Sequence, residues 1–130
     1  MKFASVRLVT LDVDRLVAFY SRLSGTDAIR PAEGFAEIRL SGATLAISAE
    51  HLIQRFNAGA AVAAANRSAI LEFEVDDVDR VLSSLGDTAA VVQGTTVMPW
   101  GNRSLLLRDP DGSVVNVFSR PQAAAQVTDR

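Results

Sequence analysis

A four-residue phrase occurs twice in this chain of 130 residues, and the repeat constrains the fold more than any other feature. Asp-Val-Asp-Arg stands at residues 12–15 and again at residues 77–80, an offset of 65 residues, or half the chain. A second echo, at an offset of 70, relates residues 42–48 to residues 112–118, and each copy begins with glycine. Self-similarity of this kind predicts a pseudo-symmetric fold of two related halves with a site between them.

Both halves predict the same order of elements. Apolar and β-branched runs predict strands at residues 3–10, 28–31, 35–40 and 43–48, and at 69–75, 89–98, 103–108 and 113–119. Asp12 and Asp77 are expected to cap helices, and Gly25 is expected to end the first of them. The apolar stripe of that first helix is Val13, Leu16, Val17, Tyr20 and Leu23.

The predicted fold class is therefore α+β, with two βαβββ modules at residues 1–48 and 69–120 of a single domain. Residues 49–68 form the predicted linker, and the alanine-rich stretch 57–66 within it is expected to be partly helical. Residues 121–130 are expected to form a flexible tail.

Composition excludes several partners. The net charge is −2 and the chain has no basic patch, which argues against nucleic acid. It has no cysteine, so disulfides and thiolate metal sites are excluded. No apolar run is long enough to span a membrane, and the N-terminus lacks the apolar core of a signal peptide. These features predict a cytoplasmic protein.

Three further motifs carry a family resemblance: residues 73–79 (Phe-Glu-Val-Asp-Asp-Val-Asp), Pro99-Trp100-Gly101 followed by residues 108–112 (Arg-Asp-Pro-Asp-Gly), and Phe19-Tyr20 followed by Gly25. Their order and spacing resemble the vicinal oxygen chelate superfamily, which includes glyoxalase I, extradiol dioxygenases and bleomycin-resistance-type binding proteins. The resemblance implies paired modules that enclose a cleft. It also implies a homodimer in which modules are exchanged between two chains.

Enzymes of this family hold a divalent metal through four ligands, usually His, Gln or Glu. Counting from the two repeats places these ligands at Ser5, Ala46, Ile70 and Asn116. Alanine and isoleucine cannot ligate a metal, and serine and asparagine alone are weak ligands. We therefore expect no metal and no cofactor. A hidden metal site would need a register shift of one residue, which would turn the side chains to the other face of the sheet.

Strand alternation predicts which side chains line the cleft. Those expected to contact a ligand are Ser5, Arg7, Val9, Phe35, Ala46, Ser48, Phe56, Ile70, Glu72, Trp100, Arg103, Asn116 and Phe118. Arg7 and Glu72 occupy equivalent places in the two modules, either as an ion pair that fixes their docking or as ligand contacts. Trp100 is either a core anchor or a wall that stacks on an aromatic ligand. The single histidine, His51, lies outside the predicted strands.

The loss of the ligand positions favours a non-catalytic protein that confers self-resistance by sequestering an antibiotic in a dimer-interface cleft. The expected ligand is a planar polycyclic aromatic or bleomycin-type compound, and no residue is assigned a catalytic role. The alternatives are a glyoxalase-like or dioxygenase-like lyase or isomerase with an atypical metal site, a metal-free enzyme with Glu72 or Glu74 as base, and an accessory domain that binds another protein.

Overall fold

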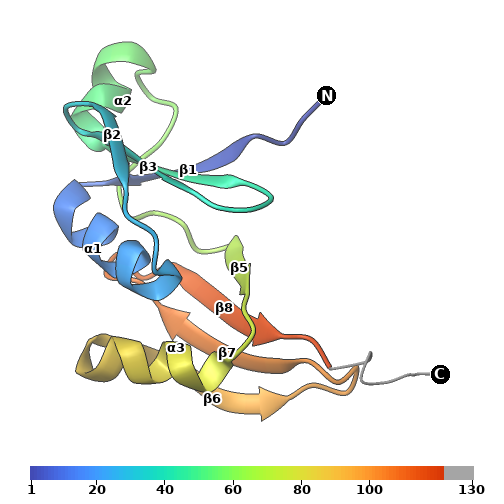
Figure 1. The fold of residues 1–130 in the computed structure, drawn as a ribbon. Coiled ribbons are helices and arrows are strands. Elements are labelled where there is room, and N and C mark those ends of the chain that lie inside the picture. Colours follow the sequence, from blue (N-terminus) through green and yellow to red (C-terminus); the bar gives the residue numbers. More distant parts are fainter. Residues whose placement is uncertain (122–130) are drawn as a thin grey trace. The chain divides into compact units, whose positions relative to one another are not determined.

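The computed structural model describes residues 1–121 and contains two four-stranded sheets with the same strand topology (Figure 1). The chain divides into two compact units. The first unit comprises residues 1–68 together with residues 109–113. The second unit comprises residues 69–108 and the described residues from 114 onward. Within residues 1–121, no helix combines the length and the apolar composition that a membrane span needs.

The first unit carries one sheet in the order β1-β4-β3-β2, with β1 and β4 parallel and the other pairs antiparallel. Its elements are β1 (Ser5–Thr10), α1 (Val13–Ser24), β2 (Ile29–Ala32), β3 (Phe35–Arg39), β4 (Thr44–Ala49) and α2 (Glu50–Phe56). Helix α1 contacts β3 and β4. Its apolar stripe, with Leu16 and Tyr20 each 1% exposed, packs on alternate strand residues such as Ile38 and Ile47.

The second unit repeats this plan in the order β5-β8-β7-β6, with β5 and β8 parallel. Its elements are β5 (Ile70–Glu74), α3 (Val78–Leu85), the 3₁₀ turn η1 (Gly86–Thr88), β6 (Ala90–Val97), β7 (Arg103–Arg108) and β8 (Val114–Ser119). Helix α3 contacts β7 and β8, whose alternate residues Leu105, Leu107, Val115 and Val117 are fully buried. The prediction of two βαβββ modules is confirmed.

Each of the two sequence repeats builds the same local structure in both of its copies. Asp12 Oδ1 accepts a hydrogen bond from the Arg15 backbone N–H at 3.0 Å, and Asp77 Oδ1 accepts one from the Arg80 N–H at 3.1 Å. Both aspartates thus cap helices by satisfying a backbone donor that has no partner within the helix. The glycines of the second repeat, at positions 42 and 112, both have φ +93°, a conformation that L side chains rarely adopt.

The linker differs from the expectation in where its helix lies. The helix is α2, at Glu50–Phe56, and residues 57–66 form turns and irregular backbone instead. Helix α2 can bury an apolar side chain, since Ile53 is 1% exposed, whereas Gly59 and the alanines offer little apolar area to hold a helix in place. Of the predicted tail, only Pro121 is described; residues 122–130 lie outside the described part.

Candidate functional site

One side of the first sheet is free of α1 and carries most of the residues predicted from the first half of the chain. Strand register sets Arg7 beside Ala46 and Ala46 beside Glu37, and it sets Val9 beside Ser48 and Ser48 beside Phe35. Laterally paired residues point to the same side of a sheet. We call this side the first face, and its members on β1, β4 and β3 are Ser5, Arg7, Val9, Phe35, Glu37, Arg39, Thr44, Ala46 and Ser48.

The first face has a floor of small residues flanked by charged and aromatic ones. Ala46 and Ser48 are only 3% and 1% exposed, so they form a covered floor rather than an open slot. Arg39 donates two hydrogen bonds to Glu37 Oε1, from Nε at 3.0 Å and from Nη2 at 2.7 Å. Glu37 is therefore already paired with a cation on its own strand.

The corresponding side of the second sheet carries both apolar and polar side chains. Register sets Ile70 beside Val114, Glu72 beside Asn116, and Asn116 beside Leu106. We call this side the second face, and its members on β5, β7 and β8 are Ile70, Glu72, Glu74, Ser104, Leu106, Arg108, Val114, Asn116 and Phe118.

At the centre of the second face, the Asn116 amide donates from Nδ2 to Glu72 Oε2 at 3.0 Å. Asn116 Oδ1 is buried and has no hydrogen-bond partner among residues 1–121. Towards one end of this face, the Arg120 guanidinium pairs with Glu74 at 3.2 Å and lies over the Phe118 ring at 5.4 Å. The face thus combines apolar side chains with a carboxylate–amide pair at its centre and an ion pair towards one end.

The four positions at which the sequence repeats predict the family's metal ligands fall on these faces. Ser5 and Ala46 lie on the first face, and Ile70 and Asn116 lie on the second. Together they offer one hydroxyl and one amide but no imidazole or carboxylate, which does not fit the donor set of a divalent ion. In the described part of the chain, no group of three or more His, Asp or Glu side chains is arranged to hold a metal.

Three other predicted residues lie off both faces. Arg103 lies two residues before the buried Leu105 of β7, so it is on the helix-facing side of that strand. Its Nη2 lies 3.0 Å from Oδ1 of Asp79 in α3. Phe56 ends α2 and is 67% exposed beneath the Arg55 guanidinium. Trp100 lies in the loop between β6 and β7 and is 68% exposed, so the interpretation as a core anchor is wrong. His51 is exposed on α2.

The interpretation of residues 108–112 as a family motif missed that the turn at residues 109–113 belongs to the first unit. Asp109 is 4% exposed, and its Oδ2 accepts a hydrogen bond of 2.7 Å from the Tyr20 hydroxyl of α1. Its Oδ1 accepts from the backbone N–H groups of Asp111 and Ser113. Burial, together with the nearby Asp109 charge, holds the pKa of Tyr20 far above its usual value, so its hydroxyl keeps its proton.

A second contact fixes the same turn. Arg15 Nη2 donates to the Pro110 carbonyl at 3.1 Å and to Asp111 Oδ1 at 3.3 Å. In the sequence, the signal for this docking was the tyrosine in the helix stripe, because a buried phenol needs a hydrogen-bond partner. Nothing in the sequence indicated that the partner lies 89 residues away.

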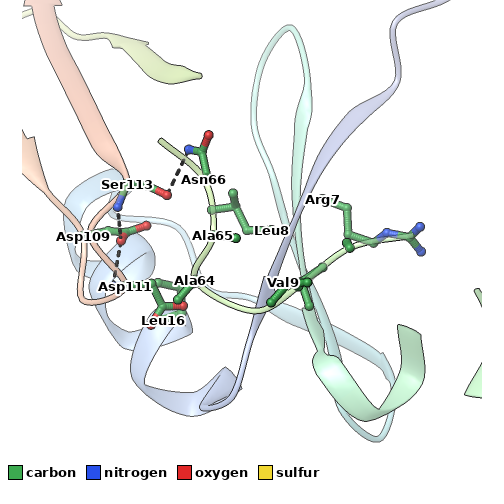
Figure 2. A pocket seen from close by; sticks show the side chains of 12 residues that line it. Arg7, Leu8, Val9, Leu16, Ala64, Ala65, Asn66, Asp109, Asp111 and Ser113 are labelled. Atoms are coloured by element: carbon green, nitrogen blue, oxygen red, sulfur yellow. Dashed lines mark hydrogen bonds between the residues drawn. The ribbon is translucent and has the colours of Figure 1, made fainter. Parts of the chain in front are cut away.

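A cavity of about 270 Å³ lies beside β1 within the first unit (Figure 2). It lies between β1, α1, linker residues 61–66 and the turn at 109–113. The linker runs along the edge of β1, where the Ala64 N–H donates to the Val9 carbonyl at 3.0 Å, and Asn66 Nδ2 donates to Ser113 Oγ at 3.1 Å. Of the residues predicted to contact a ligand, only Arg7 and Val9 line this cavity.

Comparison with solved structures finds the same fold in other proteins. A glyoxalase/bleomycin resistance protein/dioxygenase family enzyme from Burkholderia phytofirmans PsJN has a TM-score of 0.81 at 17% identity, covering 93% of this chain and all of that one. A glyoxalase-related enzyme from Fulvimarina pelagi has a TM-score of 0.79 at 20% identity over 93% of this chain and 89% of that one. TioX from Micromonospora sp. ML1 has a TM-score of 0.68 at 22% identity over 93% and 100% of the two chains.

A search of curated proteins finds no significant match. The family model of the glyoxalase-like domain, in contrast, matches residues 5–118, which span the described strands and helices of both units up to the last residue but one of β8. The chain therefore belongs to the glyoxalase-like domain family, within the vicinal oxygen chelate superfamily.

Proposed function

We propose that this protein binds a small aromatic molecule without the help of a metal ion. The observation that carries the proposal is the donor set at the four family ligand positions, Ser5, Ala46, Ile70 and Asn116. Metal chemistry in this fold needs imidazole or carboxylate donors at these places, and none of the four residues supplies one. Under this proposal, the protein binds a ligand with the surface that the family uses but does not carry out metal-dependent catalysis.

The second face supports an aromatic ligand. Ile70 is 54% exposed there, and Leu106, Val114 and Phe118 lie on the same side of the sheet. Apolar walls with a few placed polar groups are the usual composition of small-molecule sites. Here the polar group is Asn116, whose amide is held by Glu72 and whose carbonyl oxygen can accept a hydrogen bond from a phenol or an amine.

We propose further that the ligand is an antibiotic-like polycyclic aromatic compound and that the protein captures it stoichiometrically. A homodimer with one cleft for each pair of modules is the proposed assembly. Light scattering tests this assembly, because one chain has a mass of 13.9 kDa and the dimer has twice that mass.

Isothermal titration with a panel of anthraquinones, naphthoquinones and bleomycin tests the binding proposal. Submicromolar binding of at least one polycyclic quinone is expected. The variant Asn116→Leu should weaken it by about tenfold, because the amide hydrogen bond is lost. Ser84→Ala, on the exposed side of α3, is the control and should leave affinity unchanged. If no compound of the panel binds below the micromolar range, the proposal fails.

Turnover separates binding from catalysis. Asn116 donates a hydrogen bond to the Glu72 carboxylate on the second face, and this carboxylate is the base that we propose for the metal-free enzyme. The bound compound, recovered and weighed by mass spectrometry, is expected to be unchanged. A converted compound would favour the metal-free enzyme, and loss of that conversion in Glu72→Gln would assign the base.

A further inference from the structure

We propose that the cavity beside β1 is a second binding site, which takes a small organic cation with an apolar body. Its lining residues belong to the first unit, and they include Arg7 and Val9 of the first face but no residue of the second face. The site is therefore separate from the second face, where the polar anchor Asn116 of the polycyclic ligand is proposed above. The argument rests on the polar end of the cavity, its walls and its volume.

The polar end is formed by the turn at residues 109–113, where one carboxylate is fully used and the other is not. Asp109 accepts hydrogen bonds on both oxygens, from Tyr20 and from two backbone N–H groups. Asp111 accepts one on Oδ1 from Arg15, whereas its Oδ2 is buried with no hydrogen-bond partner among the described residues. A buried carboxylate oxygen without a donor is unfavourable, so a ligand that supplies a donor is favoured there.

The arginines near this end do not supply that donor. Arg15 reaches only Oδ1, and its side chain is 57% exposed while that of Asp111 is 11% exposed. Arg67 lies against Gly112 and donates to the Asn66 carbonyl, and it does not line the cavity. Arg7 does line it, but Figure 2 shows its guanidinium pointing away from Asp109 and Asp111. A cationic group of a ligand would therefore lie next to the Asp111 carboxylate at the polar end of the cavity.

The walls are apolar and the volume is small. Leu8, Val9 and Leu16 form one side, and Ala61, Val62 and Ala64 of the linker form the other. A volume of about 270 Å³ lies just below the roughly 300–1,000 Å³ typical of sites for drug-sized ligands. The cavity therefore suits a single ring or a short branched alkyl group that carries an ammonium.

Benzylammonium is a suitable probe, and benzyl alcohol is its neutral counterpart of similar size. In ¹⁵N-labelled protein, benzylammonium is expected to shift the backbone amide signals of Val62, Ala64, Asp111 and Ser113 with millimolar affinity. Benzyl alcohol should bind at least about tenfold more weakly, because it lacks the charge that pairs with the carboxylate. Equal binding of the two compounds, or no shift at these amides, would overturn the proposal.

Two variants test the site from independent directions. Asp111→Asn should weaken benzylammonium binding by about tenfold or more, whereas Asp87→Asn, an exposed site in η1, should leave it unchanged. Ala61→Phe should abolish binding by filling the cavity, and it keeps the proposal testable if Asp111→Asn fails to fold. Unaltered binding in a folded Ala61→Phe variant would refute the site. Quinone binding at the second face should survive Ala61→Phe, so the two proposals can fail separately.

Discussion

A single buried hydrogen bond, from the Tyr20 hydroxyl to Asp109, joins residues 89 positions apart in the chain. Tyr20 is 1% exposed and Asp109 is 4% exposed, so neither group has water as an easy substitute partner. Hydrogen bonds to a charged acceptor are stronger than neutral ones, particularly where the surroundings are apolar. This bond and the Arg15 contacts are what attach the turn at 109–113 to α1.

Replacing Tyr20 by phenylalanine should destabilise the protein by about 1–3 kcal/mol, because Asp109 Oδ2 then remains buried without its donor. Urea unfolding followed by circular dichroism measures the change. Ser84→Ala, which removes an exposed hydroxyl from α3, is the control and should change stability little. An unchanged free energy of unfolding in Tyr20→Phe would show that the bond contributes nothing.

The same tyrosine predicts a loss of stability at high pH. Burial and the Asp109 carboxylate raise the pKa of Tyr20 above its ordinary value of 10.0. Below that value, folded and unfolded chains both keep the proton and Tyr20 contributes no pH dependence. Above it, the unfolded chain releases the proton while the folded chain retains it, so stability falls as pH rises. Urea midpoints measured from pH 8 to pH 11 should fall more steeply in the wild type than in Tyr20→Phe.

At the scale of the elements, the repeated Asp-Val-Asp-Arg phrase acts as two helix starts. Helix α3 has only eight residues, so it depends on its cap and on packing more than a long helix does. Asp77→Ala should destabilise the second unit by about 1 kcal/mol, while Asp77→Asn, which keeps an acceptor oxygen, should lose less. Unfolding curves of the two variants test this order, and equal losses would argue against the side-chain cap.

The parts of the fold that the sequence predicted correctly are those set by local signals, namely helix caps and strand alternation. Helix α1 begins directly after its Asp12 cap and ends before Gly25, as the pattern indicated. The faces of β1 and β5 follow from alternation, because a shift of one residue would expose the buried set. Helix α2 was misplaced because the alanine-rich stretch has high helix propensity but no apolar stripe to pack.

The arrangement of the candidate sites could not be predicted, because it depends on contacts between residues far apart in the sequence. The cavity beside β1 is closed by linker residues of irregular backbone, whose path follows from the bond between Ala64 and Val9. The sequence did not show that Trp100 and Phe56 are exposed, because their exposure is set by their positions in a loop and at a helix end. The pair between Arg103 and Asp79 likewise needed the packing of α3 on its sheet.

At the scale of the whole molecule, the family fold is present while the four predicted ligand positions carry neither imidazole nor carboxylate. These positions lie on the sides of the two sheets that are opposite to the apolar cores beneath α1 and α3. Selection on the fold alone does not require histidine or glutamate there, because the packing beneath the helices is independent of them. Metal binding can therefore be compared between the wild-type protein and a variant in which metal-binding side chains are introduced.

The wild-type protein is expected to hold no stoichiometric Zn²⁺ or Ni²⁺ after incubation and desalting, as elemental analysis will show. The double variant Ile70→His/Asn116→Glu adds an imidazole and a carboxylate beside Glu72 on the second face, which gives three donors at neighbouring positions. That variant should therefore gain metal-dependent thermal stabilisation, since a ligand that binds only the folded state raises its stability. Metal retained by the wild type at one ion per chain would contradict the metal-independent function. A folded double variant that gains no metal would show that these three side chains do not converge.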